Sequence, residues 1–233
     1  MAAARKPFCA VVDQVPAWAY NTPWREDLVS YAGGKTWYRF VNYLPPPSGF
    51  INKLTRNLAS NIAQDKAPLL VLAGGPGLPV SYLEPLELMA GVGRQVIFYD
   101  QVGCGNTFLA SNSTCPPADQ LTLDLYLRQI DALREALGLE KVHLYGQGVL
   151  AGWDAQGLGL SSLQETPVLV TRGEFDEVSH ASAQQLAGLL PNCQMAEFAG
   201  AGSYQHIDAW EPHLTRIELH LCAAEGSPIP KTA

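Results

Sequence analysis

The sequence predicts an α/β protein with a mostly parallel, doubly wound sheet. Short runs of consecutive apolar residues are typical of strands that are covered on both faces of a sheet. Segments with a helical pattern alternate with these runs, and strand–helix alternation predicts parallel strands joined by helical crossovers. The apolar runs are 69–73, 95–99, 142–145 and 168–171.

The N-terminal part departs from this alternation. Residues 1–25 show no clear hydrophobic period, so we expect an irregular arm. Residues 28–31 and 36–43 flank the pair Gly33-Gly34, which predicts a β-hairpin with a two-residue turn. We expect the remainder of the chain, 26–233, to form a single domain, and 233 residues suit one α/β domain.

Three further elements follow from the pattern. Residues 121–137 are the clearest helix, since five apolar residues recur at spacings of 3 and 4 and so share one helix face. Gly138 follows directly, as expected just past a helix end. Residues 181–190 and 209–221 are predicted helices on either side of a strand at 194–198.

Charge and composition exclude several classes of partner. The chain has 15 basic and 22 acidic residues, a net charge of −7, which argues against nucleic acid or an anionic membrane as the main partner. No apolar run approaches the length of a membrane span. The five cysteines lack paired metal-type spacing, so we expect free thiols in a reducing compartment, the cytoplasm, with no metal and no cofactor.

Four motifs, in order along the chain, resemble one known family. They are PLLVLAGGPG at 68–77, YLEPL at 82–86, VIFYDQVGCG at 96–105 and LVTRGEFD at 169–176. Together they resemble the proline iminopeptidase group of the α/β-hydrolases, which includes related amino-acid amidases. Ala73 stands where the family has a histidine. The resemblance implies an α/β-hydrolase fold. It also implies a serine hydrolase activity that releases N-terminal residues from peptides or amino-acid amides.

The nucleophile of that family is missing from this chain. In α/β-hydrolases a Gly-x-Ser-x-Gly turn presents the serine at the end of a central strand. Here the turn after the apolar run 142–145 reads Gly-Gln-Gly-Val-Leu, and Gly148 stands at the nucleophile position. Two alignments are open: a simple Ser→Gly replacement at Gly148, or a deletion of three residues from the family's Gln-Ser-Trp-Gly-Gly sequence. Both remove the serine.

The other members of the site have candidates by resemblance. Asp176 follows an apolar run in the position of the family's acid, and His206 precedes the final helix in the position of its histidine. The backbone N–H groups of Gly74 or Gly75 and of Val149 are expected to form the oxyanion hole.

The segment after the elbow is also shortened. Only 19 residues, 148–166, stand where family members have a helix, a further strand and a helical cap, so the cap and one strand–helix unit are expected to be lost. Nineteen residues can still bridge two parallel strands, since such a crossover needs about a dozen. We therefore expect 168–171 to pair beside 142–145.

Three hypotheses about function are open. The chain is a non-catalytic derivative that binds a ligand or a protein, an active hydrolase with an unexpected nucleophile or a water activated by His206, or a shortened product of splicing or of a faulty gene model. Cys104 could be imagined as that nucleophile, but no neighbour in the sequence would lower its pKa. The expected ligand, if any, is a small peptide or amino-acid amide. The sequence does not predict the oligomeric state.

Overall fold

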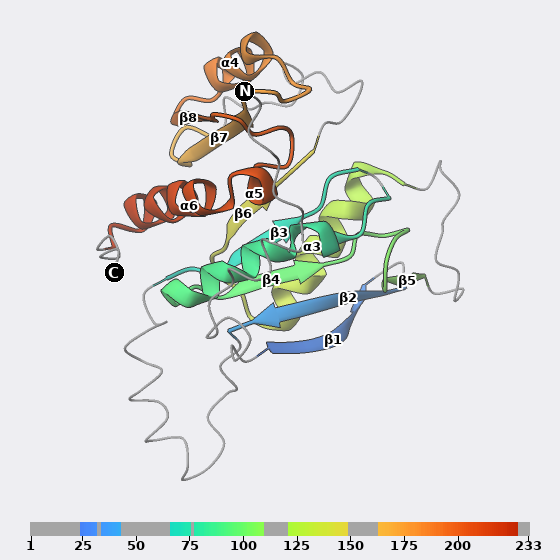
Figure 1. Cartoon of the computed structure of the whole chain (residues 1–233). Helices are drawn as coiled ribbons and strands as arrows, with labels where there is room; N and C mark the ends of the chain where they lie inside the picture. Colours follow the sequence, from blue (N-terminus) through green and yellow to red (C-terminus); the bar gives the residue numbers. More distant parts are fainter. Residues whose placement is uncertain are drawn as a thin grey trace. The chain divides into compact units, whose positions relative to one another are not determined.

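A computed structural model describes residues 24–31, 34–42, 66–75, 77–109, 121–148 and 163–227 (Figure 1). The chain divides into two compact units. One unit is Pro16–Gly148, and the other is Val149–Ala233 with Met1–Val15. Each is described by itself below, and the single domain expected over 26–233 stays a prediction. Most of the expected arm, 1–23, lies outside the described residues, and a strand already begins at Trp24.

The first unit contains one six-stranded sheet in the order β1-β2-β4-β3-β6, with β5 paired to β2. Strands β3, β4 and β6 are mutually parallel, whereas β2 runs antiparallel to β1, β4 and β5. The sheet is therefore mixed, and the prediction of a mostly parallel sheet was wrong here because the N-terminal hairpin joins the sheet instead of standing apart. The strands are β1 (Trp24–Tyr31), β2 (Gly34–Val41), β3 (Leu69–Leu72), β4 (Val96–Tyr99), β5 (Phe108–Leu109) and β6 (His143–Gly146).

The predicted hairpin is present, but Gly34 belongs to its second strand. Tyr31 pairs with Gly34, so Gly34 is the first residue of β2 and not part of the turn. The register is explained by burial: Tyr38 and Phe40 on β2 are 1% and 5% exposed and belong to the core cluster. A slip of one residue would turn both rings to the opposite face of the sheet.

Two helices accompany this sheet. The predicted helix at 121–137 is confirmed as α3 (Leu123–Leu137), which begins after the capping side chain of Thr122 and ends at Gly138 with φ 66°. Its residues Ile130, Leu133 and Leu137 pack into the core cluster. The 3₁₀ helix η2 (Val80–Val92) contains the 82–86 motif.

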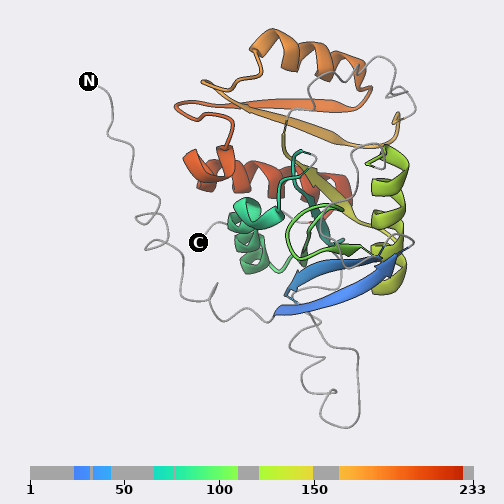
Figure 2. The same cartoon turned by 90° about the vertical axis from the view of Figure 1, so that its right-hand side faces the viewer.

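The second unit contains a parallel pair of strands, β7 (Val168–Gly173) and β8 (Cys193–Phe198). The helix α4 (His180–Leu189) connects them, and the pair lies between α4 and the last helix (Figures 1 and 2). The predicted final helix at 209–221 is α6 (Trp210–Glu225), preceded by the short helix α5 (Gln205–Asp208). β6 pairs with β3 and β7 with β8. The expected pairing of 168–171 beside 142–145 would join the two units and stays a prediction.

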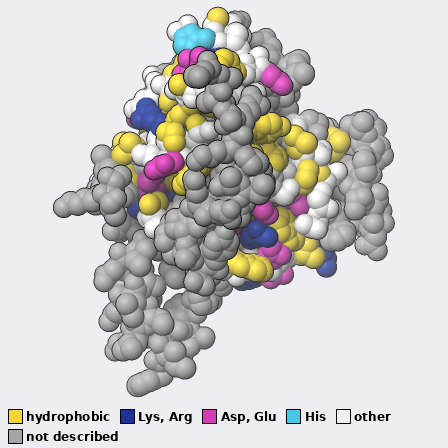
Figure 3. Space-filling view, viewed as in Figure 1, with side chains coloured by type: hydrophobic (Ala, Val, Ile, Leu, Met, Phe, Trp, Pro, Cys, Tyr) yellow, Lys and Arg dark blue, Asp and Glu magenta, His cyan; other side chains and the backbone are white. Residues whose placement is uncertain are grey.

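Charged and apolar side chains are mixed on the described part of the visible face (Figure 3). Figure 3 shows acidic and basic side chains scattered among apolar ones on the described part of the face in view, with no basic side chains gathered into one stripe. In the part of the chain that the structure describes, no helix is both long enough and apolar enough to cross a bilayer.

Candidate active site

Two glycine turns lie side by side in the first unit. One follows β3 at Gly74, and the other follows β6 at Gly148. Because β3 and β6 are parallel neighbours in which Leu72 is opposite Gly146, both turns leave the sheet at the same edge. The structure thus brings together the predicted nucleophile position and the predicted oxyanion turn. Val149, the other expected oxyanion donor, lies outside the described residues.

The contact between these turns leaves no room for a side chain. A Cβ added to Gly148 would lie 2.8 Å from the Cα of Gly74, and Gly148 has φ 125°, a conformation that residues with a side chain rarely adopt. A Cβ added to Gly74 would in turn overlap the backbone oxygen of Gln147. The two turns therefore touch backbone to backbone, and each depends on the glycine of the other.

Side chains that the sequence analysis did not single out hold this arrangement. The Gly74 N–H donates to the hydroxyl oxygen of Tyr82 at 2.7 Å, and that hydroxyl donates to Oε1 of Gln147 at 2.8 Å. On the other side of the turn, Nε2 of Gln101 donates to the Ala73 carbonyl at 2.7 Å. Tyr82 and Gln101 both lie within the motifs that carry the family resemblance. That location was the available signal, but it did not indicate which atoms they would contact.

Asp100 has a structural role at the start of η2. Its Oδ1 accepts from the Val80 N–H at 2.9 Å, and its Oδ2 accepts from the Asn106 N–H at 2.8 Å. Both carboxylate oxygens are therefore used to fix backbone, which ties the helix to the turn after β4.

Cys104 does not have the properties of a nucleophile. Burial, followed by the nearby Asp100 carboxylate, raises the pKa of its thiol to about 11. Its Sγ donates to the carbonyls of Gln101 at 3.2 Å and Leu78 at 3.4 Å. The thiolate is the reactive form of cysteine, and this environment disfavours it.

In the second unit, Asp176 lies in the loop between β7 and α4, as predicted. Its carboxylate accepts hydrogen bonds from Oγ of Ser203 at 3.0 Å, from Nε2 of Gln205 at 2.9 Å and from the Val178 N–H at 3.1 Å. Two of these donors come from the segment that carries His206. The structure therefore joins the predicted acid loop to the predicted histidine segment, with Gln205 and Ser203 as side-chain links that the sequence analysis missed.

His206 lies in α5, directly after Gln205, and its side chain is 0% exposed. Its ring meets the ring of Tyr204 edge to face, with 5.8 Å between centroids. Burial lowers the pKa of its neighbour in the same unit, His213, to about 4, and the charge of His206 adds to this shift. A proton on His206 therefore disfavours a proton on His213.

The buried side chain of Arg172 donates hydrogen bonds to the backbone of the loop that carries Asp176. Arg172, 6% exposed, donates to the carbonyls of Glu174 at 3.5 Å and Val178 at 3.4 Å, on either side of Asp176. It also forms an ion pair with Glu197. The pKa of the Glu197 carboxyl is lowered, first by its hydrogen bond with His180 and then by that with Arg172.

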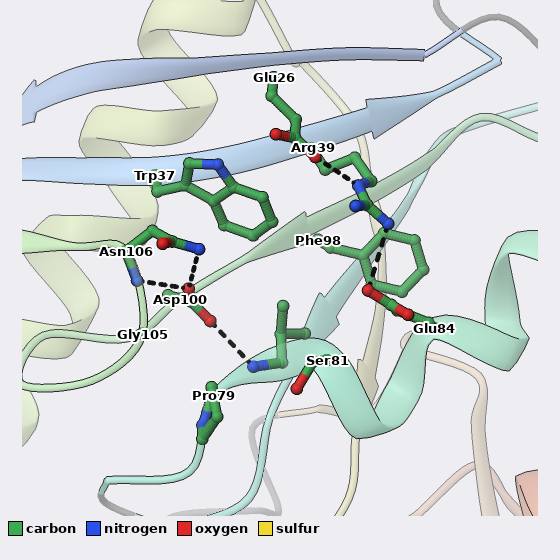
Figure 4. A pocket seen from close by; sticks show the side chains of 11 residues that line it. Glu26, Trp37, Arg39, Pro79, Ser81, Glu84, Phe98, Asp100, Gly105 and Asn106 are labelled. Atoms are coloured by element: carbon green, nitrogen blue, oxygen red, sulfur yellow. Dashed lines mark hydrogen bonds and ion pairs between the residues drawn. The ribbon is translucent and has the colours of Figure 1, made fainter.

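A pocket lies elsewhere in the first unit. It has a volume of about 260 Å³ and lies between β2, β4 and the start of η2 (Figure 4). Arg39 crosses its rim between Glu26 at 2.8 Å and Glu84 at 3.3 Å, beside the rings of Trp37 and Phe98. No residue predicted for the active site lines this pocket, so it does not supply a substrate site for the hydrolase chemistry. No group of three metal-ligating side chains occurs among the described residues.

Comparison with known proteins gives the relationship directly. No family model matches the chain. The proline iminopeptidase of Clostridioides difficile is 35% identical over 211 residues, which cover 86% of this chain and 62% of that protein. The proline iminopeptidase of Lactobacillus delbrueckii subsp. lactis is 35% identical over 158 residues, which cover 63% of this chain and 50% of the relative. The chain thus spans 50% to 62% of the length of these two relatives.

Solved structures agree on the fold. The crystal structure of proline iminopeptidase from Mycobacterium smegmatis matches with a TM-score of 0.68 at 19% identity, covering 86% of this chain and 99% of that one. Carboxylesterase CesB from Bacillus subtilis matches with a TM-score of 0.61 at 15% identity, covering 93% and 97%. The chain therefore has the α/β-hydrolase fold, and proline iminopeptidases are its homologues over most of its length.

Proposed function

We propose that this chain is a derivative of a proline iminopeptidase-like hydrolase that no longer forms an acyl-enzyme. The observation that carries the proposal is Gly148. It stands at the nucleophile position, has no hydroxyl, and lies so close to Gly74 that a side chain would not fit without movement of the backbone. Without a nucleophilic oxygen, the acid and base positions at Asp176 and His206 have nothing to activate.

The expected loss of activity is large. Removing the serine of a hydrolase triad costs on the order of a million-fold in turnover, and the surviving oxyanion hole and binding leave about 10³–10⁴ over the rate in water. In this chain we expect a smaller remainder, because Tyr82 already uses the N–H of Gly74, one of the two candidate donors of that turn.

An unexpected nucleophile is the competing possibility. Cys104 is disfavoured by its raised pKa and by the carbonyls that its thiol contacts. If the chain keeps a ligand, the resemblance indicates a small peptide or amino-acid amide, taken by a non-catalytic site in the cytoplasm.

The test is hydrolysis of prolyl- and alanyl-4-nitroanilide by the purified full chain, beside the His206→Ala variant. The proline iminopeptidase of Clostridioides difficile serves as the positive control. We expect release of nitroaniline at the rate of buffer alone for both forms of this chain. A rate that is present in the unsubstituted chain and disappears in His206→Ala would overturn the proposal, because it would show chemistry that uses the inherited base.

A further inference from the structure

We infer that Tyr82 is an internal lock on the oxyanion turn: its hydroxyl occupies the amide of Gly74, one of the two expected oxyanion donors of that turn, and ties the turn to the elbow. This inference rests on the proposed function, since the turn is an oxyanion turn only by inheritance. It adds a second, separable reason for inactivity, which the missing serine does not imply.

The first step of the argument is the hydrogen-bonding capacity of the hydroxyl. A tyrosine hydroxyl can accept and donate at once. The Tyr82 hydroxyl accepts from the Gly74 N–H at 2.7 Å and donates to Oε1 of Gln147 at 2.8 Å. The hydroxyl therefore acts as acceptor and donor at once and bridges the two turns. The amide of Gly74 has a single proton, and that proton already points at an oxygen.

The second step is the contact between the turns. An oxyanion hole needs donors about 2.7–3.1 Å from an oxygen that enters from the substrate. Here the backbone oxygen of Gln147 and the Cα of Gly148 lie close against Gly74. A Cβ added to Gly74 would lie within 3.1 Å of both atoms. With the turns in contact and Tyr82 on the N–H, a substrate oxygen can reach Gly74 only if the Tyr82 hydroxyl leaves.

Amide hydrogen exchange measures this access directly, because exchange requires water to reach the N–H in place of the hydroxyl. The experiment compares the exchange rate of Gly74 in the ¹⁵N-labelled full chain with that in Tyr82→Phe. The matched control is Tyr126→Phe, which removes a buried tyrosine hydroxyl that has no hydrogen-bond partner among the described residues. Amides of β3 and β4, such as those of Leu70 and Ile97, report whether each variant is folded.

We expect Tyr82→Phe to accelerate exchange at Gly74 at least tenfold while Leu70 and Ile97 stay within twofold. Tyr126→Phe should leave Gly74 within twofold. Unchanged exchange at Gly74 in folded Tyr82→Phe would overturn the lock.

Two further measurements keep the inference testable. If Tyr82→Phe fails to fold, the unsubstituted chain decides: a nuclear Overhauser contact between the Gly74 amide proton and the Tyr82 ring supports the lock, and its absence overturns it. The nitroanilide assay fails or succeeds independently of these exchange rates. An active chain would refute the proposed loss of function, whereas unchanged exchange would refute only the lock.

Discussion

At Gly148, backbone conformation and packing both favour glycine over a residue with a side chain. A φ of 125° favours glycine, and the Cα of Gly74 stands 2.8 Å from where a Cβ would be. The position is thus more than a serine site from which the hydroxyl has been removed. An elbow serine needs space beside its Cβ, and this geometry does not provide that space under either alignment, replacement or deletion.

Replacing Gly148 with Ser should therefore destabilise the chain. We expect a loss of about 1–3 kcal/mol in the free energy of unfolding, the usual cost of a residue forced into a rare backbone conformation. Urea unfolding measures it. Gly146→Ala is the matched control, because a Cβ there has no atom within 4 Å. Equal stability of Gly148→Ser and the unsubstituted chain would contradict the packing described for the two turns.

Asp176 is held by partners that do not belong to a catalytic triad. Because hydrogen bonds to a charged group contribute about 1.5–3 kcal/mol, we expect Asp176→Ala and Gln205→Ala to be coupled by about 1 kcal/mol in a double-mutant cycle of unfolding free energies. Glu177→Ala, an exposed carboxylate beside it, should be neutral within about 0.5 kcal/mol. Additive losses for Asp176 and Gln205 would show that their 2.9 Å contact does not stabilise the protein.

At the residue scale, the sequence predicted positions better than contacts. Asp176 and Gly74 lie in the loop and the turn where their motifs place them, and His206 lies in the short helix α5, which precedes the final helix as expected. Their side-chain partners were not predicted, because Tyr82, Ser203 and Gln205 are 8 to 29 positions away from Gly74 or Asp176 in the chain. Such pairings depend on strand order, which no local pattern contains.

Among the elements, α3 depends on its first turn. The hydroxyl oxygen of Thr122 accepts from the Leu125 N–H at 3.3 Å and so satisfies one of the amides that a helix start leaves open. We expect Thr122→Ala to lower the free energy of unfolding by about 1 kcal/mol. Thr122→Ser keeps the capping oxygen and should retain most of the stability that Thr122→Ala loses. Equal losses in Ala and Ser would mean that the methyl group, and not the cap, stabilises this end.

The elements also show where sequence patterns are informative. The apolar runs gave β3, β4, β6 and β7 within a few residues, because a strand covered on both faces needs side chains of that kind throughout. The mixed sheet was not predicted, since the hairpin pattern sets only the pairing of β1 with β2. The 3₁₀ geometry of η2 was also beyond the pattern: Pro85 lies within it, and proline removes a backbone donor from a helix.

At the scale of the whole molecule, acid should weaken the fold through His213. Burial, and then the charge of His206, lowers its pKa from 6.5 to about 4 in the folded chain. The unfolded state therefore binds the proton first as pH falls. The contribution of His213 to the free energy of unfolding is complete above about pH 6.5. It is lost between about pH 6.5 and pH 4, at about 1.4 kcal/mol per pH unit.

Urea midpoints at pH 7.5 and pH 5.0 test this dependence. The decrease in midpoint on acidification should be smaller in His213→Gln, in which no imidazole titrates, than in the unsubstituted chain. His180→Gln is the comparison for loss of an exposed imidazole, because the ion pair of His180 with Glu197 is solvent-exposed and should contribute little to the free energy of unfolding. Equal pH dependence in His213→Gln and the unsubstituted chain would remove His213 as the cause.

The most direct test of the missing nucleophile needs no knowledge of the substrate. A fluorophosphonate probe phosphonylates the activated serine oxygen of a hydrolase and releases fluoride, so one covalent adduct per chain reports a working nucleophile. Intact-mass measurement of the full chain after incubation should show the unmodified mass, with the proline iminopeptidase of Clostridioides difficile labelled under the same conditions. A single adduct that forms on this chain and is lost in His206→Ala would contradict the account, because it would reveal an activated nucleophile despite Gly148.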